Sequence, residues 1–232
     1  MKLWLAFVAL ALVLHAQNAP RITLVANAEG ENAVIAPNTW VEVKGASLSK
    51  PGDSRIWQTS DFAKNQLPTN LDRVSVTVNG ESAYVYYISP TQVNILTPPD
   101  SMTGSVAVVV TNNGAISAPY LVQAQVTSPS FFLFNGGPYV AATHVSGGLL
   151  GPASLYPGST TPAAPGETVV LYANGFGQTS TPVVSGAETQ SGTLSPLPTI
   201  SFGGFAATVI CRTGGARRVS VQRRCSGERA QR

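Results

Sequence analysis

Few residues of this chain combine the types and spacing that catalysis requires. His144 is the single histidine beyond residue 16, and Ser146 follows it two positions later. A Ser-His-Asp site needs a base that is held by an acid and aimed at a nucleophile. No G-x-S-x-G turn is present to expose a serine. We therefore expect His144 to be a solvated loop histidine, and we expect no catalytic residue and no enzymatic activity.

Metal and nucleotide sites also lack their usual spacing. Asp53, Asp61 and Asp72 are spread along the chain, whereas metal sites need clustered His, Cys or carboxylate ligands. The turn at 174–177 has two glycines but lacks the lysine of a phosphate-binding loop. The sequence thus predicts no metal and no cofactor.

Tyrosines and amides on two neighbouring predicted strands are the main indication of binding. Tyr84 and Tyr86 are two positions apart and therefore share one face of a strand, and Gln92 and Asn94 do the same on the next. Exposed tyrosines on a flat sheet suit stacking on sugar rings, and amides suit hydrogen bonding. Packing within the sheet explains the same pattern. These four residues are our candidate ligand-binding set.

Short β-strands must position these side chains, because the chain beyond the first 16 residues shows no helical period. Val74, Val76 and Val78 alternate strictly, and Asn79-Gly80 follows them. Asn-Gly is typical of a type I′ hairpin turn, which needs positive φ at both central residues. The predicted strands cover 21–26, 40–44, 74–78, 83–88, 93–96, 105–111, 120–126 and 168–173.

The segment 47–70 has no strand pattern. It contains Trp57 and Phe62, and we expect a long excursion between strands with about one helical turn. Long loops in compact domains are often functional. The two aromatic residues otherwise serve to cap one end of a sandwich.

The first 16 residues have the composition of a signal peptide. Lys2 precedes an apolar run from Leu3 to Leu14, and Ala16 offers a small residue for cleavage. The run is too short to span a bilayer. We therefore expect a secreted or cell-envelope protein without a membrane span in the mature chain.

Charge is distributed unevenly between the body and the last residues. The whole chain carries +3, but residues 18–210 hold six Lys or Arg against ten Asp or Glu, which gives −4. Seven of the ten arginines and both cysteines lie in residues 211–232. The basic pI therefore belongs to the tail, and we infer no nucleic-acid partner.

Two segments of the chain repeat each other at a constant offset of 124 residues. Residues 76–85 align with residues 200–209, and Gly80 corresponds to Gly204. Leu67-Pro68 and Leu197-Pro198 precede the two copies. The second copy stops resembling the first after Ile210, so we expect it to be incomplete.

The residues after Ile210 form an aberrant basic tail, which we expect to be disordered. Back-translation allows another reading frame that keeps the Gln-x-Asn-x-x-x-Pro spacing of Gln92, Asn94 and Pro98. A frameshift is therefore our hypothesis, and a genuine basic sorting tail is the alternative.

These motifs carry a resemblance to a known family. Residues 67–69, 76–80, 88–94 and 165–177 resemble an uncharacterised bacterial secreted-protein C-terminal domain family, the Solibacter-type C-terminal module, which is similar to IPT/TIG Ig-like domains. The resemblance implies an all-β Ig-like sandwich and export, and it transfers no catalytic residues.

Together the observations predict a signal peptide (1–16), an Ig-like module (18–127), a partial second module (128–210) and the tail (211–232). We expect a non-catalytic adhesion or accessory module with a protein or cell-surface glycan as partner. The alternative is a carbohydrate-binding module that uses an exposed tyrosine face.

Overall fold

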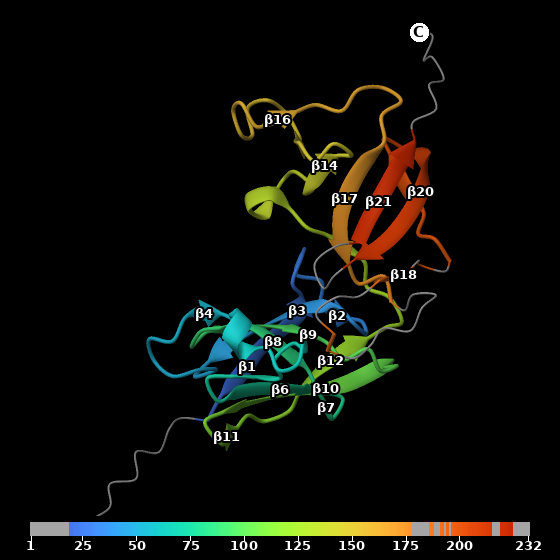
Figure 1. Ribbon diagram of the computed structural model, residues 1–232. Helices are drawn as coiled ribbons and strands as arrows, with labels where there is room; N and C mark the ends of the chain where they lie inside the picture. The colour runs from blue at the N-terminus through green and yellow to red at the C-terminus, as the bar shows by residue number, and fades with distance from the viewer. Residues whose placement is uncertain are drawn as a thin grey trace, which may run out of the picture.

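A computed structural model of the chain describes residues 19–177, 186–187, 191–192, 194, 196–214 and 219–224. The predicted signal peptide lies outside these residues. The described chain is nearly all β, as predicted, and forms two parts that Figure 1 shows one above the other. Residues 21–124 form a sandwich of two sheets, and residues 130–224 contribute a third sheet.

The sandwich consists of a five-stranded sheet and a seven-stranded sheet. We call the first the front sheet and the second the back sheet. The front sheet has the order β1 (Arg21–Asn27), β3 (Trp40–Ala46), β9 (Gln92–Leu96), β8 (Tyr84–Ile88) and β4 (Arg55–Ile56). The main path of the back sheet is β2 (Val34–Ile35), β12 (Tyr120–Ala124), β10 (Gly104–Asn112), β6 (Val74–Val78) and β5 (Asn70–Leu71). Two short strands, β7 (Glu81–Ser82) and β11 (Ala115–Ile116), pair with β6 and β10.

Alternating valines and isoleucines fill the space between the two sheets. Val74, Val76 and Val78 of β6 are almost fully buried, while Ser75 and Thr77 between them are half-buried. Val93 and Ile95 of the front sheet are fully buried in the same core. Each such side chain contributes about 1.5–3 kcal/mol of transfer free energy. The period of two in the sequence therefore selects the buried face of each strand.

The segment 47–70 contains one short helical turn, as predicted. Helix η1 (Thr59–Asp61) is a 3-10 helix, and the Asp61 carboxylate accepts a hydrogen bond from the Gln58 backbone N–H. Arg55 donates to both Asp61 and Asp72, which ties this segment to the end of β5. The excursion is therefore a fixed part of the sandwich, and its Trp57 is buried.

The third sheet is built around β17 (Val169–Asn174). Its main path is β16 (Thr160–Thr161), β15 (Leu149–Leu150), β14 (Ala142–His144), β17, β21 (Val219–Arg224), β20 (Phe205–Gly214) and β18 (Ser191–Gly192). Strands β13 (Ser130–Phe131) and β19 (Ile200–Phe202) pair with β17 and β20. After β13 the chain makes the 3-10 turn η2 (Phe134–Gly136).

The repeated hairpins have the same register. Thr77 pairs with Ser82 in the first copy, and Ser201 pairs with Ala206 in the second, at the offset of 124 residues. The central residues of both turns have positive φ, with +53° and +87° at Asn79-Gly80 and +57° and +86° at Gly203-Gly204. These angles confirm the predicted type I′ turn. Its central residues must adopt the left-handed region, which glycine and asparagine tolerate.

Residues 211–214 and 219–224 form strands, whereas we expected a disordered tail after Ile210. Strand β20 continues to Gly214, and β21 pairs with both β17 and β20. Figure 1 shows β21 between these two strands. The order β17-β21-β20 repeats the order β3-β9-β8 of the front sheet. Strand β21 thus occupies the position in which the repeat predicts a counterpart of β9. Residues 225–232 lie outside the described chain.

Buried polar side chains join the two parts. Asn27 Nδ2 donates to the Ser128 carbonyl at 2.7 Å, and Asn174 Nδ2 donates to Asn27 Oδ1 at 3.2 Å. Ser128 N–H also donates to the Gly175 carbonyl at 2.7 Å. All three side chains are buried. Paired polar groups of this kind fix an orientation, because each loses its solvation if the parts separate.

Candidate functional site

A β-bulge in β8 shapes the outer face of the front sheet. The pairing of β8 with β9 shifts register between Val85 and Tyr87, so Tyr86 is the extra residue. A bulge bends the strand and re-aims side chains near it. The Tyr86 ring lies 5.5 Å from Trp40 and 4.9 Å from Trp57, measured between ring centroids. The bulge therefore places Tyr86 among the aromatic residues of β3 and the 47–70 segment.

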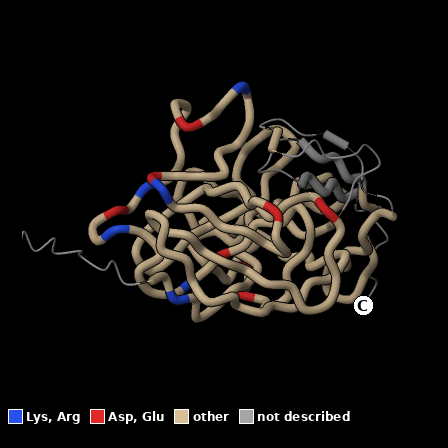
Figure 2. Tube along the Cα trace, turned by 90° about the horizontal axis from the view of Figure 1, so that it is seen from below, with Lys and Arg blue, Asp and Glu red and all other residues tan. Residues whose placement is uncertain are grey.

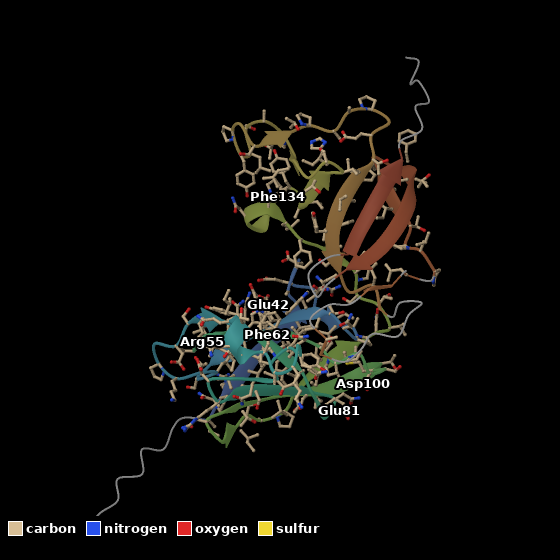
Figure 3. All side chains as sticks on the ribbon, viewed as in Figure 1. Glu42, Arg55, Phe62, Glu81, Asp100 and Phe134 are labelled. Atoms are coloured by element: carbon tan, nitrogen blue, oxygen red, sulfur yellow. The ribbon has the colours of Figure 1, made fainter. Side chains whose placement is uncertain are left out.

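Four rings form one aromatic cluster on this face. Trp40 lies 5.9 Å from Trp57, and Trp57 lies 5.3 Å from Phe62. The ring planes of the neighbouring pairs are inclined at 60–75°. Edge-to-face arrangements at such distances are favourable by about 0.5–1.5 kcal/mol each. Figure 3 shows Phe62 on the side of the sandwich that faces the third sheet. Trp57 thus packs against both Trp40 and Tyr86, and Phe62 packs against Trp57.

A pocket of about 370 Å³ lies between the front sheet and the third sheet. We call it the junction pocket. Trp40, Tyr86 and Asn94 line it from the sandwich, and Phe132 and Tyr172 line it from the other part. Its volume falls at the small end of the range for ligand sites, about 300–1,000 Å³. Aromatic walls with a few polar groups are typical of sites that bind small molecules or single side chains.

Glu29 supplies the charge of the junction pocket. It follows β1 and lines the pocket next to Ala28. Burial raises the pKa of its carboxyl group, and the nearby Glu42 carboxylate adds to the increase, while a hydrogen bond from the Leu133 backbone N–H opposes it. The Glu29 backbone is fixed at both ends, since its N–H donates to Asn27 Oδ1 and its carbonyl accepts from Ser130 Oγ. These contacts fix the Glu29 backbone beside the pocket, and the hydrogen bond from Leu133 orients the carboxylate.

The four residues predicted as ligand-binding have different positions. Tyr86 and Asn94 line the junction pocket. Gln92 does not line it, but its Nε2 donates to Asn94 Oδ1 at 2.7 Å and so orients that amide. Tyr84 is only 7% exposed and belongs to the core. Tyr84 and Tyr86 therefore do not form one exposed face. Tyr84 packs in the core and against Gly186, which agrees with the alternative of packing, whereas the bulge places Tyr86 in the aromatic cluster.

Sequence reasoning missed Glu29, Trp40, Phe132 and Tyr172. Trp40 had a usable signal: it alternates with Glu42 and Lys44 opposite the buried Val41 and Val43. That pattern marks the outer face of β3. The other residues come from distant parts of the chain and meet only when the two parts are joined.

His144 is not a solvated loop residue, in contrast to the prediction. It ends β14, and its Nδ1 contacts Glu167 Oε1. Its Nε2 lies 3.2 Å from the Thr161 carbonyl oxygen and 2.8 Å from Thr161 Oγ1. The Glu167 carboxylate and the Thr161 carbonyl raise the pKa of the imidazole. A ring that donates from both nitrogens is protonated, so this arrangement favours an ion pair over a general base.

Charged residues in the described chain are few, and basic and acidic segments are interspersed (Figure 2). In this part of the chain no group of three or more His, Cys, Asp or Glu is arranged to hold a metal ion. Asp61 and Asp72, considered above as metal ligands, both accept hydrogen bonds from Arg55. No helix of the described residues is long and apolar enough to cross a membrane.

The chain is similar to parts of larger solved proteins. The chain is 11% identical in sequence to gamma-CGTase from alkalophilic Bacillus clarkii. The match to its crystal structure has a TM-score of 0.33 and covers 67% of this chain and 23% of the gamma-CGTase chain. The full extracellular region of plexin A4 is 13% identical with a TM-score of 0.31, over 89% of this chain and 15% of that one. The chain thus spans less than a quarter of either structure. No curated protein matches it.

The sandwich itself has a family match. All strands of its two sheets except β1 and β2 lie within the matched segment, as does the hairpin at Asn79-Gly80. Residues 36–132, which are less than half of the chain, match the family model of the IPT/TIG domain.

Proposed function

We propose that this chain is an exported, non-catalytic interaction module that acts in adhesion or as an accessory domain. The observation that carries the proposal is the junction pocket, to which the Ig-like sandwich and the part with the third sheet both contribute aromatic and polar side chains. Ig-like domains generally present binding surfaces on a rigid scaffold. The buried contacts of Asn27, Ser128 and Asn174 provide that rigidity at the pocket.

Export and surface binding are tested together. The full chain is expressed in a bacterial host with a tag, and the extracytoplasmic fraction is sequenced from its N-terminus. We expect cleavage after Ala16. The labelled protein is then incubated with bacterial and host cell surfaces. Retention in the cytoplasm, or binding to no surface, would reject the proposal.

The pocket gives this assay a matched pair of variants. Tyr86→Ala removes a pocket wall, whereas Tyr139→Ala removes an exposed tyrosine outside it. We expect surface binding to fall with the first change and to persist with the second. Equal binding by both variants would place the interaction elsewhere on the molecule.

Carbohydrate binding is the second candidate, because Tyr86 and Asn94 lie in the same pocket as Trp40. Aromatic rings with a neighbouring amide suit a sugar that offers both a C–H face and hydroxyl groups. A glycan array probed with the chain, Tyr86→Ala and Asn94→Ala tests this. A signal that both changes abolish would support it, and an empty array would exclude it.

We further infer that the residues after Ile210 derive from a shifted reading frame. The arginine-rich composition of residues 211–232 supports this, as does the loss of sequence similarity to the first copy at that point. The nucleotide sequence of the gene tests it. A shifted frame without strand-like residues beyond the position of Arg232 would favour a genuine basic tail.

A further inference from the structure

We propose that the junction pocket binds an organic cation, an alkylammonium or guanidinium group, between its aromatic rings and the Glu29 carboxylate. This inference rests on the proposed role of the pocket as a binding site and names the class of its ligand. Three observations carry it: the arrangement of the rings, the sign of the charge, and the enclosure of the site by two parts of the chain.

The rings of the pocket form walls rather than a platform. Trp40 and Tyr86 meet at 66°, with their centroids 5.5 Å apart. Phe132 and Tyr172 line the opposite side and are held together by a hydrogen bond from the Phe132 N–H to the Tyr172 carbonyl at 2.9 Å. A cation within about 6 Å of several ring faces is attracted to each of them. Sugar stacking uses an open, flat ring surface, which this inclined pair does not offer.

The charge that lines the pocket is negative. Among the described residues that line it, Glu29 is the only charged one. Glu42, which interacts with Glu29, pairs with Lys44, whose Nζ contacts Glu31 Oε1 at 2.5 Å and Glu42 Oε1 at 3.1 Å. No salt bridge of the described residues includes Glu29. A carboxylate that is partly removed from water is stabilised by an incoming cation.

Lining by two parts of the chain strengthens both attractions, because it removes a bound cation partly from water. Glu29, Trp40 and Tyr86 come from the sandwich, whereas Phe132 and Tyr172 come from the third sheet and the segment before it. Cation–π attraction is about 0.5–1 kcal/mol at exposed sites and reaches about 2 kcal/mol or more when the cation is desolvated. The same cation is available from a free amine or from a lysine, methylated lysine or arginine side chain of a partner protein.

Intrinsic fluorescence reports on the pocket directly. Trp40 lines it and Trp57 contacts Trp40, and these are the only tryptophans beyond residue 16. The full chain is titrated with choline and, in parallel, with 3,3-dimethyl-1-butanol, which has the same shape without the charge. We expect a saturable change with choline and affinity at least about tenfold weaker for the neutral alcohol, as loss of the charge interaction predicts. Equal affinity for the two probes would overturn the proposal.

A conservative variant separates charge from shape. Glu29→Gln keeps the size of the side chain, and we expect it to weaken choline binding about tenfold or more without changing the binding of the alcohol. Glu81→Gln is the control, because Glu81 is exposed on β7 of the back sheet and Figure 3 shows it on the side away from Phe134. If Glu29→Gln and Glu81→Gln bind choline equally, the carboxylate has no role and the proposal fails.

Two further binding experiments identify the source of the cation and test sugars as the competing class of ligand. Peptides with lysine, trimethyllysine or arginine, compared with free choline, show which cation binds more tightly. A panel of neutral sugars forms the last arm. Saturable binding of sugars without binding of any cation would overturn this inference but leave the proposed interaction module intact. Absence of cell-surface binding in the earlier assay would reject that module, whether or not choline binds.

Discussion

Asn174 donates a hydrogen bond to Asn27 across 147 residues of sequence, and both side chains are buried where the two parts of the molecule meet. Asn27 Oδ1 also accepts the Glu29 backbone N–H at 3.1 Å, while its Nδ2 donates to the Ser128 carbonyl. One amide therefore joins the two parts and positions the charged residue of the junction pocket. This coupling means that stability and binding change together when the amide is altered.

Asn27→Ala should destabilise the fold by about 1–3 kcal/mol, because the Ser128 carbonyl and the Asn174 amide lose a buried partner. Chemical denaturation monitored by tryptophan fluorescence measures this free energy of unfolding. The exposed Asn32 serves as the control, and Asn32→Ala should change stability by less than about 0.5 kcal/mol. Equal effects of the two changes would show that the junction contributes nothing.

Gly175→Ala should destabilise the junction more strongly. Gly175 has φ +80°, and an added Cβ would lie 1.9 Å from the Ser128 carbonyl oxygen. We expect a loss above about 2 kcal/mol, since backbone strain and overlap act together. Gly52→Ala is the matched control: Gly52 has φ +88° with no atom within 4 Å of the added group. That variant should lose only about 1 kcal/mol from backbone strain. Thermal unfolding of the two proteins compares them.

The local elements of the fold were predictable from sequence because their signals are local. Val74, Val76 and Val78 determine a buried face by alternation, and Asn79-Gly80 determines the turn that follows. The repeat correctly predicted a second hairpin of the same register at Ser201 and Ala206.

The junction pocket was not predictable in the same way. Tyr86 enters it through a bulge that no residue type announces, and Glu29 meets Tyr172 only after the two parts are joined. Tyr84 and Tyr86 show where the alternation rule fails. They are two residues apart, but the residue inserted at the bulge leaves Tyr84 in the core and Tyr86 in the wall of the pocket. Sequence therefore identified the strand of the site, and tertiary packing determined which of its residues are available.

Arg55 should stabilise the segment that supports the aromatic cluster. Its guanidinium donates to Asp72 through Nε at 2.5 Å and to Asp61 through Nη1 at 2.8 Å, and it lowers the pKa of both carboxyl groups. Arg55→Met should cost about 1–2 kcal/mol, because two carboxylates lose their charge-assisted hydrogen bonds at a partly exposed site. We also expect red-shifted tryptophan emission, since Trp57 follows two residues later. Lys50→Met, at an exposed position, should leave the emission unchanged.

The pair of His144 and Glu167 should make the third sheet sensitive to pH. The contact raises the pKa of His144 above its usual 6.5 and lowers that of Glu167 below 4.5. The stabilising effect of the histidine is therefore complete below pH 6.5 and is lost as pH rises through its raised pKa, whereas that of the glutamate is complete above pH 4.5 and is lost as pH falls through its lowered pKa. The contact should stabilise the fold most between about pH 4.5 and 6.5.

An NMR titration of the His144 ring checks this directly. Glu167→Gln removes the negative charge and should return the pKa of His144 towards 6.5, because the hydrogen bond to Glu167 is the largest cause of the increase. Thr161→Val removes only the hydroxyl at 2.8 Å and leaves the carbonyl contact, so its effect on the pKa should be small. A ring that titrates near 6.5 in the unaltered chain would mean that the ion pair does not persist in solution, and the stability maximum near pH 4.5–6.5 should then be absent as well.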